Sequence, residues 1–282
     1  PLIEVLIMQL ASRFSRGSTV ARADRALSND EICAAAPSIF ADAAHESRSA
    51  RYTYIPTIDV LDGLRREGFA PFMVCQTRVR SEGKREHTKH MLRLRHAEQI
   101  TGKEANEIIL LNSHDGTSSY QMLAGMFRFV CQNGLVCGEI SSDIRVRHNG
   151  NVVGEVVEGA FKVLDSFEQI TQQREAMQGV TLNPGEQSAF AHAALSLKYD
   201  EGEGAAPVTE AQILTPRRFE DRRDDMWGTF NRVQENLLKG GLRGRSKIGR
   251  STTTRQVNGI DQSVKLNRAL WILAEEMRKL KS

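Results

Sequence analysis

The sequence predicts an α+β protein in which an antiparallel sheet of hairpins packs on helices and is followed by a helical C-terminal region. Two observations support this fold class. Short apolar runs with the period-two spacing of strands cluster in the first half of the chain, and apolar residues at helical spacing dominate the second half. With 282 residues, 40% of them apolar, the chain can bury a substantial core as one large domain or two smaller ones.

The chain is expected to have four parts. Composition and charge place an N-terminal extension at 1–46, an α+β core at 47–199, an acidic linker at 200–206 and a helical region at 207–282 that contains a basic loop, 239–255. Residues 1–7 are interpreted as an upstream extension of a chain that starts at Met8. In the N-terminal part, Ser28 to Glu31 has the composition of a helix N-cap, and a second short helix is expected in residues 38–46.

In the core, a helix is expected from Thr57 to Gly68, a residue suited to ending it. Three strands should follow, and they are 72–80, 88–96 and 107–111. Apolar residues at helical spacing from Met122 to Val130 then predict a helix that ends at Gly134.

A second hairpin is expected after this core, with strands 143–148 and 151–157. Helices are expected from there on, at about 159–178, 184–197, 221–238 and 261–280. The last two should pair antiparallel, with Trp227 and Trp271 as packing anchors, so that the basic loop between them is tethered and exposed.

The run from Lys239 to Arg255 contains six cations, four glycines and no carboxylate. Glycines let backbone N–H groups approach a phosphate, while Arg and Lys supply charge and hydrogen-bond donors. This composition is typical of a contact with a nucleic-acid backbone. A flexible, solvated loop that joins two helices is the alternative interpretation.

A second concentration of cations lies on two of the expected strands. Arg78 and Arg80 share one face of the first strand, and Arg93 and Arg95 share one face of the second. We therefore predict a cationic sheet face, with an ordinary half-buried sheet that carries arginines on its outer side as the alternative. The residues expected to neutralise phosphates are Arg78, Arg80, Arg93, Arg95, Lys239, Arg243, Arg245, Lys247, Arg250 and Arg255.

Two groups of residues suggest chemistry. Ser113, His114 and Asp115 are the residue types of a hydrolytic site, but neighbours in a loop rarely reach relay geometry, so turn formation and helix capping are expected. His87 and His90 are zinc-ligand types, yet positions three apart on a strand face opposite sides. No nucleotide-binding or metalloprotease motif is present, so the sequence predicts no cofactor and no metal and favours a protein that is not an enzyme. A hydrolase or nuclease built on His114 and Asp115 stays open.

The cysteines, the terminal segments and the tyrosines indicate the cellular compartment and possible contacts of the protein. The four cysteines lack CxxC spacing and a secreted disulfide pattern, so buried, reduced thiols in the cytoplasm are expected. No terminal segment is long and apolar enough to cross a bilayer, so no membrane partner is expected. Tyr52, Tyr54 and Tyr120 are candidates to stack on bases, but burial at a sheet edge is expected for two of the three.

Several short motifs occur in a fixed order along the chain. They are Asn112-Ser-His-Asp-Gly-Thr with Tyr120, Gly125-Met-Phe-Arg-Phe-Val-Cys-Gln-Asn-Gly-Leu135, Gln234-Glu235 before Lys239-Gly-Gly241, Asn267, and Leu270-Trp271. Over roughly residues 45–275 the sequence thereby resembles a plasmid- and prophage-borne family of unknown function that includes proteins named YfjQ, YafZ and "phage/plasmid-like protein". The resemblance implies a mobile-element origin in a bacterial cytoplasm and no established activity.

A more distant similarity lies in the order of elements. A helix, three antiparallel strands and a helix, over about residues 57–134, are similar to the core of single-strand annealing proteins of the RecT, Redβ and Rad-fifty-two kind. Such proteins assemble as rings or filaments and hold DNA in a basic groove. The similarity implies an annealing-protein-like β-β-β-α core and a homo-oligomer.

These observations together lead us to expect a nucleic-acid-binding protein. Its expected ligand is single-stranded DNA, bound or annealed during recombination or replication of a mobile element without nucleotide hydrolysis. Sequence preference should be slight, because phosphate contacts position a protein without specifying bases. The alternative is a counter-defence protein that binds and blocks a host restriction or immunity protein, because an arginine-rich surface can also dock on an acidic protein face.

Overall fold

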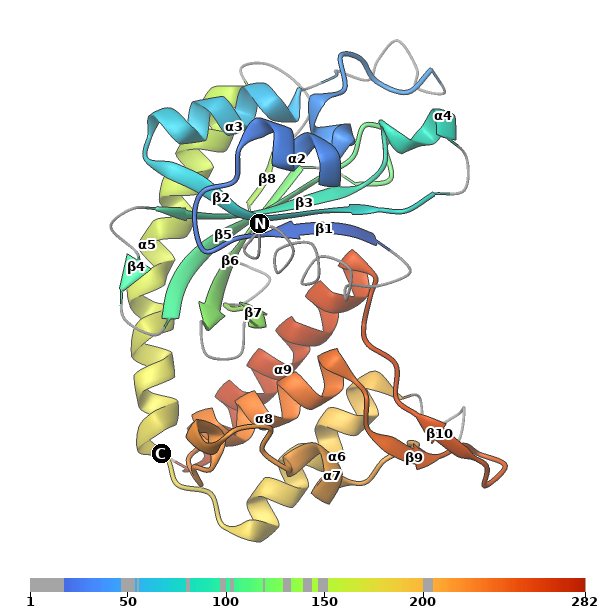
Figure 1. Ribbon diagram of the computed structural model, residues 1–282. Coiled ribbons are helices and arrows are strands. Elements are labelled where there is room, and N and C mark those ends of the chain that lie inside the picture. The colour runs from blue at the N-terminus through green and yellow to red at the C-terminus, as the bar shows by residue number, and fades with distance from the viewer. Residues whose placement is uncertain are drawn as a thin grey trace, which may run out of the picture. The chain divides into compact units, whose positions relative to one another are not determined.

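The structure is a computed structural model that describes residues 18–46, 54, 56–79, 82–96, 100–101, 104–118, 120–128, 133–138, 144–146, 152–199 and 205–281. Its mixture of helices and an antiparallel sheet confirms the predicted α+β class (Figure 1). The chain forms two compact units. Unit 1 consists of Pro1–Gly134, Ile140–Phe167 and Asn258–Ile260, and unit 2 of Leu135–Glu139, Glu168–Val257 and Asp261–Ser282.

The larger sheet has eight strands in the described residues. They are β1 (Ser18–Arg22), β2 (Phe69–Thr77), β3 (His90–His96), β4 (Ile100–Thr101), β5 (Glu104–Asn112), β6 (Tyr120–Arg128), β7 (Asn133–Val136) and β8 (Ile144–Val146). The order is β1-β2-β3-β5-β6-β7, with β4 on β5 and β8 on β6. The three strands expected first are β2, β3 and β5, which pair antiparallel in sequence order. The N-terminal region contributes β1, which pairs with β2.

The helices of unit 1 lie on one face of this sheet (Figure 1). They are α2 (Asn29–Ala35), the 3₁₀ turn Pro37–Phe40, α3 (Thr57–Arg66), the short α4 (Glu82–Arg85) and the first part of α5 (Val152–Gly179). Ser28 and Glu31 form the capping box that their spacing predicts at the start of α2. The core between these layers includes Val60 and Leu64 of α3 and Leu92 of β3, all fully buried.

The helix expected at residues 122–134 is wrong, because residues 120–128 form strand β6. This strand pairs with β5 from Leu111 opposite Gln121 to Glu104 opposite Arg128. Seven consecutive residues of β6 are buried, so apolar side chains are needed on both faces and the period-two signal disappears. The annealing-protein-like order of three strands and a helix is therefore not present at this place in the chain.

The prediction of a second hairpin is also wrong for its second strand, 151–157. Residues 144–146 form β8 on β6, but α5 begins at Val152, within the expected strand. The buried residues Val156, Ala160 and Val163 recur at helical spacing along α5. Clustered valines at the start of α5 favour a strand by propensity, and packing of the helix in unit 1 overrides this preference.

Unit 2 is built mainly of helices around a central one. After the second part of α5 come α6 (Pro184–Lys198), α7 (Glu210–Leu214), the 3₁₀ turn Phe219–Asp221, α8 (Met226–Lys239), a small two-stranded sheet and α9 (Ile260–Lys281). All residues of α8 from Met226 to Leu237 are buried. The predicted antiparallel pairing of α8 with α9 is confirmed, because Trp271 contacts Trp227 and Phe230, and the Gln234 amide donates to Asn267 at 2.8 Å.

The cysteines differ from one another in burial. Cys75 and Cys137 are buried, whereas Cys33 is exposed, so its predicted burial is wrong; Cys131 lies outside the described residues. Burial raises the pKa of the Cys75 thiol to about 12, which keeps it protonated. No helix in the described residues combines the length and apolar character that a membrane span requires.

Candidate functional site

The basic loop contains a short β-hairpin in unit 2, which projects from the helices of that unit in Figure 1. Strand β9 (Arg243–Arg245) pairs antiparallel with β10 (Ser251–Thr253), and Arg245 lies opposite Ser251. We use the name basic hairpin for residues 243–255. Gly244 allows β9 to lie against the segment before α7, because a Cβ at this position would meet the Pro207 carbonyl oxygen at 1.9 Å. Arg243 and Arg245, which flank Gly244, point the other way and are exposed.

Backbone hydrogen bonds fix the basic hairpin at its root. The Arg245 amide donates to the Pro207 carbonyl at 2.9 Å, and the Gln212 side chain donates to the Arg243 carbonyl at 2.7 Å. After β10, the Arg255 carbonyl accepts from the Lys198 side chain at 3.3 Å, and the same side chain donates to the Leu237 carbonyl of α8. Burial lowers the pKa of Lys198 to about 8. The hairpin is therefore a defined structural element and not an unstructured connection.

Most cations of the basic run are directed to solvent. Those of the basic hairpin are exposed, and they are Arg243, Arg245, Lys247, Arg250 and Arg255. Lys239, at the end of α8, differs because it pairs with Glu235 at 2.8 Å and retains 35% of its side-chain exposure. Glu235 also accepts two hydrogen bonds from Arg218, at 2.6 and 2.7 Å. Lys239 thus belongs mainly to the end of α8, and the five other cations form the exposed group.

The arginines expected on the sheet do not form an exposed cationic face. Arg93 and Arg95 are buried, with 5% and 2% exposure, and both bind Glu107 of the neighbouring strand. The Arg95 guanidinium carbon also lies 4.3 Å from the ring centres of both Phe72 and Phe127. Their predicted exposure is therefore wrong, because a carboxylate and two aromatic rings of the same sheet hold the guanidinium groups inside unit 1.

The other two sheet arginines lie at the end of the first expected strand. Arg78 follows β2 and is exposed, while Arg80 lies outside the described residues. Within unit 2 the structure brings the cations of the basic hairpin together, and within unit 1 Arg93 and Arg95 do not contribute to an exposed cationic face.

A second polar group, which the sequence did not predict, lies between α3 and the sheet of unit 1. Its centre is the Thr57 hydroxyl, which accepts hydrogen bonds from the Asn112 amide and the Tyr120 hydroxyl, both at 3.0 Å. The Thr57 oxygen also lies 2.9 Å from Nε2 of His90 and 3.4 Å from Nε2 of His114. All five residues are fully buried. The signal in the sequence was the placement of His90 and Asn112 at strand ends, on the same side as buried leucines.

These contacts determine the tautomer of His90. With two bonds accepted, the Thr57 hydroxyl has one proton to donate, and Nε2 of His90 is the nearer acceptor. Nδ1 of His90 then carries a proton and donates to the Ser38 hydroxyl at 2.8 Å. Burial, with a smaller contribution from neighbouring His114, lowers the pKa of His90 to about 3. The imidazole is accordingly neutral and acts as a connector between buried hydroxyl groups.

The loop after β5 has the local structure of a turn. Asp115 accepts from the Thr117 amide at 3.0 Å and from its hydroxyl at 2.6 Å, and Ser113 accepts from the Ser118 amide at 2.8 Å. Turn formation is confirmed, whereas helix capping is wrong because strand β6 follows. In the part of the chain that the structure describes, no group of three or more His, Cys, Asp or Glu side chains could hold a metal ion.

The tyrosines expected to stack on bases are placed differently. Tyr120 is fully buried in the group around Thr57, and Tyr54 is half-buried, with its hydroxyl donating to the Ala41 carbonyl. Tyr52 lies outside the described residues. Neither of the two described rings is presented as an exposed stacking surface.

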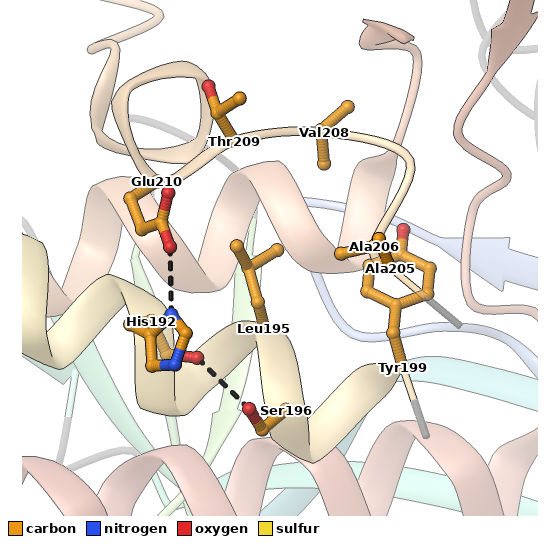
Figure 2. A pocket seen from close by; sticks show the side chains of 9 residues that line it. All are labelled: His192, Leu195, Ser196, Tyr199, Ala205, Ala206, Val208, Thr209 and Glu210. Carbon is orange, nitrogen blue, oxygen red and sulfur yellow. Dashed lines mark hydrogen bonds and ion pairs between the residues drawn. The ribbon is translucent and has the colours of Figure 1, made fainter. Parts of the chain in front are cut away.

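Unit 2 also contains a shallow pocket of about 320 Å³ between α6 and the segment that leads to α7 (Figure 2). The Nδ1–H group of His192 donates to the Glu210 carboxylate at 2.8 Å, and this hydrogen bond lowers the pKa of the Glu210 carboxyl. The remaining wall is formed by Leu195, Ser196, Tyr199, Ala205, Ala206, Val208 and Thr209. Ser196 donates to the backbone carbonyl of His192, so this bond and the one between His192 and Glu210 both lie within the wall of the pocket.

Comparison with known proteins identifies a family. A family model described as a domain of unknown function (DUF932) matches residues 44–271. The chain is 59% identical to the UPF0380 protein YfjQ of Escherichia coli (strain K12) over 269 residues, which are 95% of this chain and 97% of that protein. It is 58% identical to the UPF0380 protein YafZ of the same strain, with the same coverage. No solved structure matches the chain. The resemblance seen in the sequence motifs is thus confirmed, and the chain belongs to the DUF932 family of unknown function.

Proposed function

We propose that this protein binds nucleic acid through the basic hairpin. The observation that supports the proposal is the set of five exposed cations on one rooted hairpin, in a segment from Lys239 to Arg255 that contains no carboxylate. A cation next to a carboxylate is neutralised within the protein, as Arg93 and Arg95 are by Glu107. The basic hairpin contains no Asp or Glu, and its cations are exposed, so the segment itself has a net positive charge that attracts polyanions.

The binding mode that follows is directed at phosphates. Arg243 and Arg245 present forked donors on the outward side of β9, and Arg guanidinium groups bind phosphate oxygens bidentately. Such contacts position a protein on the backbone and carry little sequence information. The mobile-element context of the family resemblance agrees with a role in recombination or replication.

The annealing part of the sequence-based expectation has less support than binding itself. It depended on a cationic sheet face and on a helix after the third strand. The sheet arginines are held by Glu107, and a strand, β6, takes the place of that helix. The proposal is therefore binding to nucleic acid by the basic hairpin, and ring or filament assembly is not part of it.

The test is the salt dependence of binding to labelled single- and double-stranded oligonucleotides, measured by fluorescence anisotropy. If all five cations contact a duplex, log K against log salt should have a slope of about −4.5, and about −3.5 on a single strand. In the variant with Arg243, Arg245, Lys247 and Arg250 changed to Ala, one contact remains, so the slope should fall to about −1. Affinity at low salt should fall by at least about a hundredfold.

A matched control variant distinguishes loss of the hairpin cations from a general loss of positive charge. Four exposed cations of unit 2 outside the basic hairpin, Arg222, Lys265, Lys279 and Lys281, are changed to Ala, which removes the same charge. The control should keep most of the affinity and the slope. Equal losses in both variants, or no binding of the wild type to any oligonucleotide at low salt, would refute the proposal. The second outcome would direct the search to acidic surfaces of host proteins.

A further inference from the structure

The tip of the basic hairpin carries a large apolar side chain that the fold does not use. Ile248 lies between Lys247 and Gly249 and is 74% exposed. Burying an apolar side chain of this size is favourable, so an exposed position leaves that free energy available to a binding partner. The nearest cations before and after it in the sequence, Lys247 and Arg250, are exposed. The tip therefore combines one apolar group with positive charge on either side.

The turn itself gives no reason for an isoleucine. The Gly249 amide donates to the Ser246 carbonyl at 2.8 Å, and the Ser246 amide donates to the Arg250 carbonyl at 2.8 Å. Gly249 has a φ of +75°, which matches a β-turn followed by a glycine in the left-handed region. In such a turn the position of Ile248 is usually filled by Asn, Asp, Ser or Gly, whose side chains favour turns. Neither turn formation nor core packing accounts for Ile248.

The tip is held in place and does not depend on a flexible loop. The Arg250 amide donates a third hydrogen bond at the turn, to the Ser246 hydroxyl at 3.2 Å. At the other end, the Arg245 amide is bonded to the Pro207 carbonyl, and Gly244 fits closely against the same residue. Since the strands are fixed at the root and closed at the tip, Ile248 can be pressed into a partner without the hairpin folding back.

A nucleic-acid duplex has the complementary arrangement, with phosphates on the outside and stacked apolar faces of bases inside. Protein side chains such as Ile, Leu and Phe insert between base steps from the minor groove, partly unstack them and kink the duplex. Two-stranded β-ribbons are among the elements that enter DNA grooves. A lipid surface is also anionic outside and apolar inside, but one isoleucine buries too little area for stable membrane binding, which scales with buried apolar area.

We propose that Ile248 is a wedge that inserts between base pairs of duplex DNA while the cations of the basic hairpin hold the flanking phosphates. This inference rests on the proposed function and narrows it to a duplex that opens locally. Because unstacking two base pairs costs free energy, duplex sites where stacking is already weakened should be preferred. The predicted ligand is a duplex with a mismatch or a nick, over the same duplex intact.

The experiment compares the wild type with Ile248→Ser and Ile248→Leu on an intact duplex and on the same duplex with one mismatch. A 2-aminopurine beside the mismatch reports unstacking by its fluorescence. The wild type should bind the mismatched duplex about tenfold more tightly and raise the fluorescence, and Ile248→Leu should do the same. Ile248→Ser should lose the preference and the fluorescence rise but keep the salt slope, because the cations remain. Since Ile248 is exposed, both variants should unfold at the wild-type temperature.

The outcomes distinguish this inference from the proposed function. If the wild type binds duplex DNA with the expected salt slope but shows no preference and no unstacking, the wedge is refuted and hairpin binding stands. The wedge is also refuted if Ile248→Ser behaves as the wild type does. If the wild type binds no oligonucleotide, both proposals fail. Loss of binding to phosphatidylserine vesicles in Ile248→Ser, with DNA binding unchanged, would assign the tip to lipid and overturn the inference.

Discussion

The arginines of the sheet in unit 1 and those of the basic hairpin in unit 2 come from segments of similar composition but have opposite environments. Arg93 and Arg95 have almost no exposed side-chain surface, whereas Arg243 and Arg245 are exposed. The difference is a carboxylate. Glu107 lies on the strand next to Arg93 and Arg95 and is itself fully buried, while the hairpin strands pair arginine only with serine and threonine. A count of cations in a sequence therefore does not predict a binding surface unless the residues on the neighbouring strand are known.

The comparison also shows why burial of the sheet arginines is tolerated. A buried guanidinium costs several kcal/mol unless a charge partner and further contacts replace water. Glu107 accepts from Arg93 at 2.5 Å with one carboxylate oxygen and from Arg95 at 2.9 Å with the other. Phe72 and Phe127 cover the Arg95 guanidinium on its faces. Burial lowers the pKa of Arg95, and Glu107 opposes this effect.

The largest effect is expected on removing the shared carboxylate. Glu107→Gln leaves two buried guanidinium groups without a counter-charge, so the free energy of unfolding should fall by about 3–5 kcal/mol. Urea denaturation followed by circular dichroism measures it. Glu104→Gln on the same strand is the matched control, because Glu104 lies 3.5 Å from Arg128 and is partly exposed. Its cost should be about 1 kcal/mol or less. Equal costs for the two variants would contradict a central role for Glu107.

A smaller effect of burial is expected from His90, and it depends on pH. Its pKa is about 3 in the folded chain and about 6.5 in an unfolded one. Above pH 6.5 both states are neutral at this group, and as the pH falls toward 3 the unfolded state takes up the proton first. His90 should therefore destabilise the fold by about 2 kcal/mol at pH 5. The folded-state NMR signal of His90 should stay that of a neutral imidazole at this pH.

The variant His90→Gln isolates this contribution. It loses stability at neutral pH because the Thr57 hydroxyl loses its acceptor, but its stability should fall less steeply between pH 7 and pH 5 than that of the wild type. The expected difference in slope is about 1.4 kcal/mol per pH unit below pH 6. Identical slopes in wild type and variant would show that His90 does not titrate between the two states as its burial requires.

Local sequence signals correctly predicted the helices that are marked by a capping residue, a terminal glycine or regular apolar spacing. The capping box at Ser28, the glycine that ends α3 and the helical spacing of α8 and α9 are all found. Two elements were assigned to the wrong class. Strand β6 was predicted as a helix, because a strand buried on both faces lacks alternation of apolar and polar residues. The start of α5 was predicted as a strand, because its valines favour strands. For β6 and α5, packing decided the outcome, and packing cannot be read from one segment alone.

The candidate site also has one part that the sequence predicted and other parts that only the folded structure reveals. The basic run was found from its composition, because the charge of an exposed segment depends mainly on the residues of that segment. The environments of Arg93 and Arg95 could not be found, since they depend on pairing of β3 with β5, which brings Glu107 alongside. The group around Thr57 joins residues from α3, β3, β5, the following loop and β6, and only the folded sheet brings them together.

The smallest effect on stability is expected for the hairpin cations. Changing Arg243, Arg245, Lys247 and Arg250 to Ala removes exposed side chains, each worth less than about 0.5 kcal/mol in such positions. The hydrogen bonds that fix the root and the turn use backbone groups of these residues, which alanine keeps. The thermal unfolding temperature should therefore stay within a few degrees of the wild type while oligonucleotide affinity falls. A large drop in unfolding temperature would mean that these arginines, like those of the sheet, serve the fold, and the contrast between the two regions would disappear.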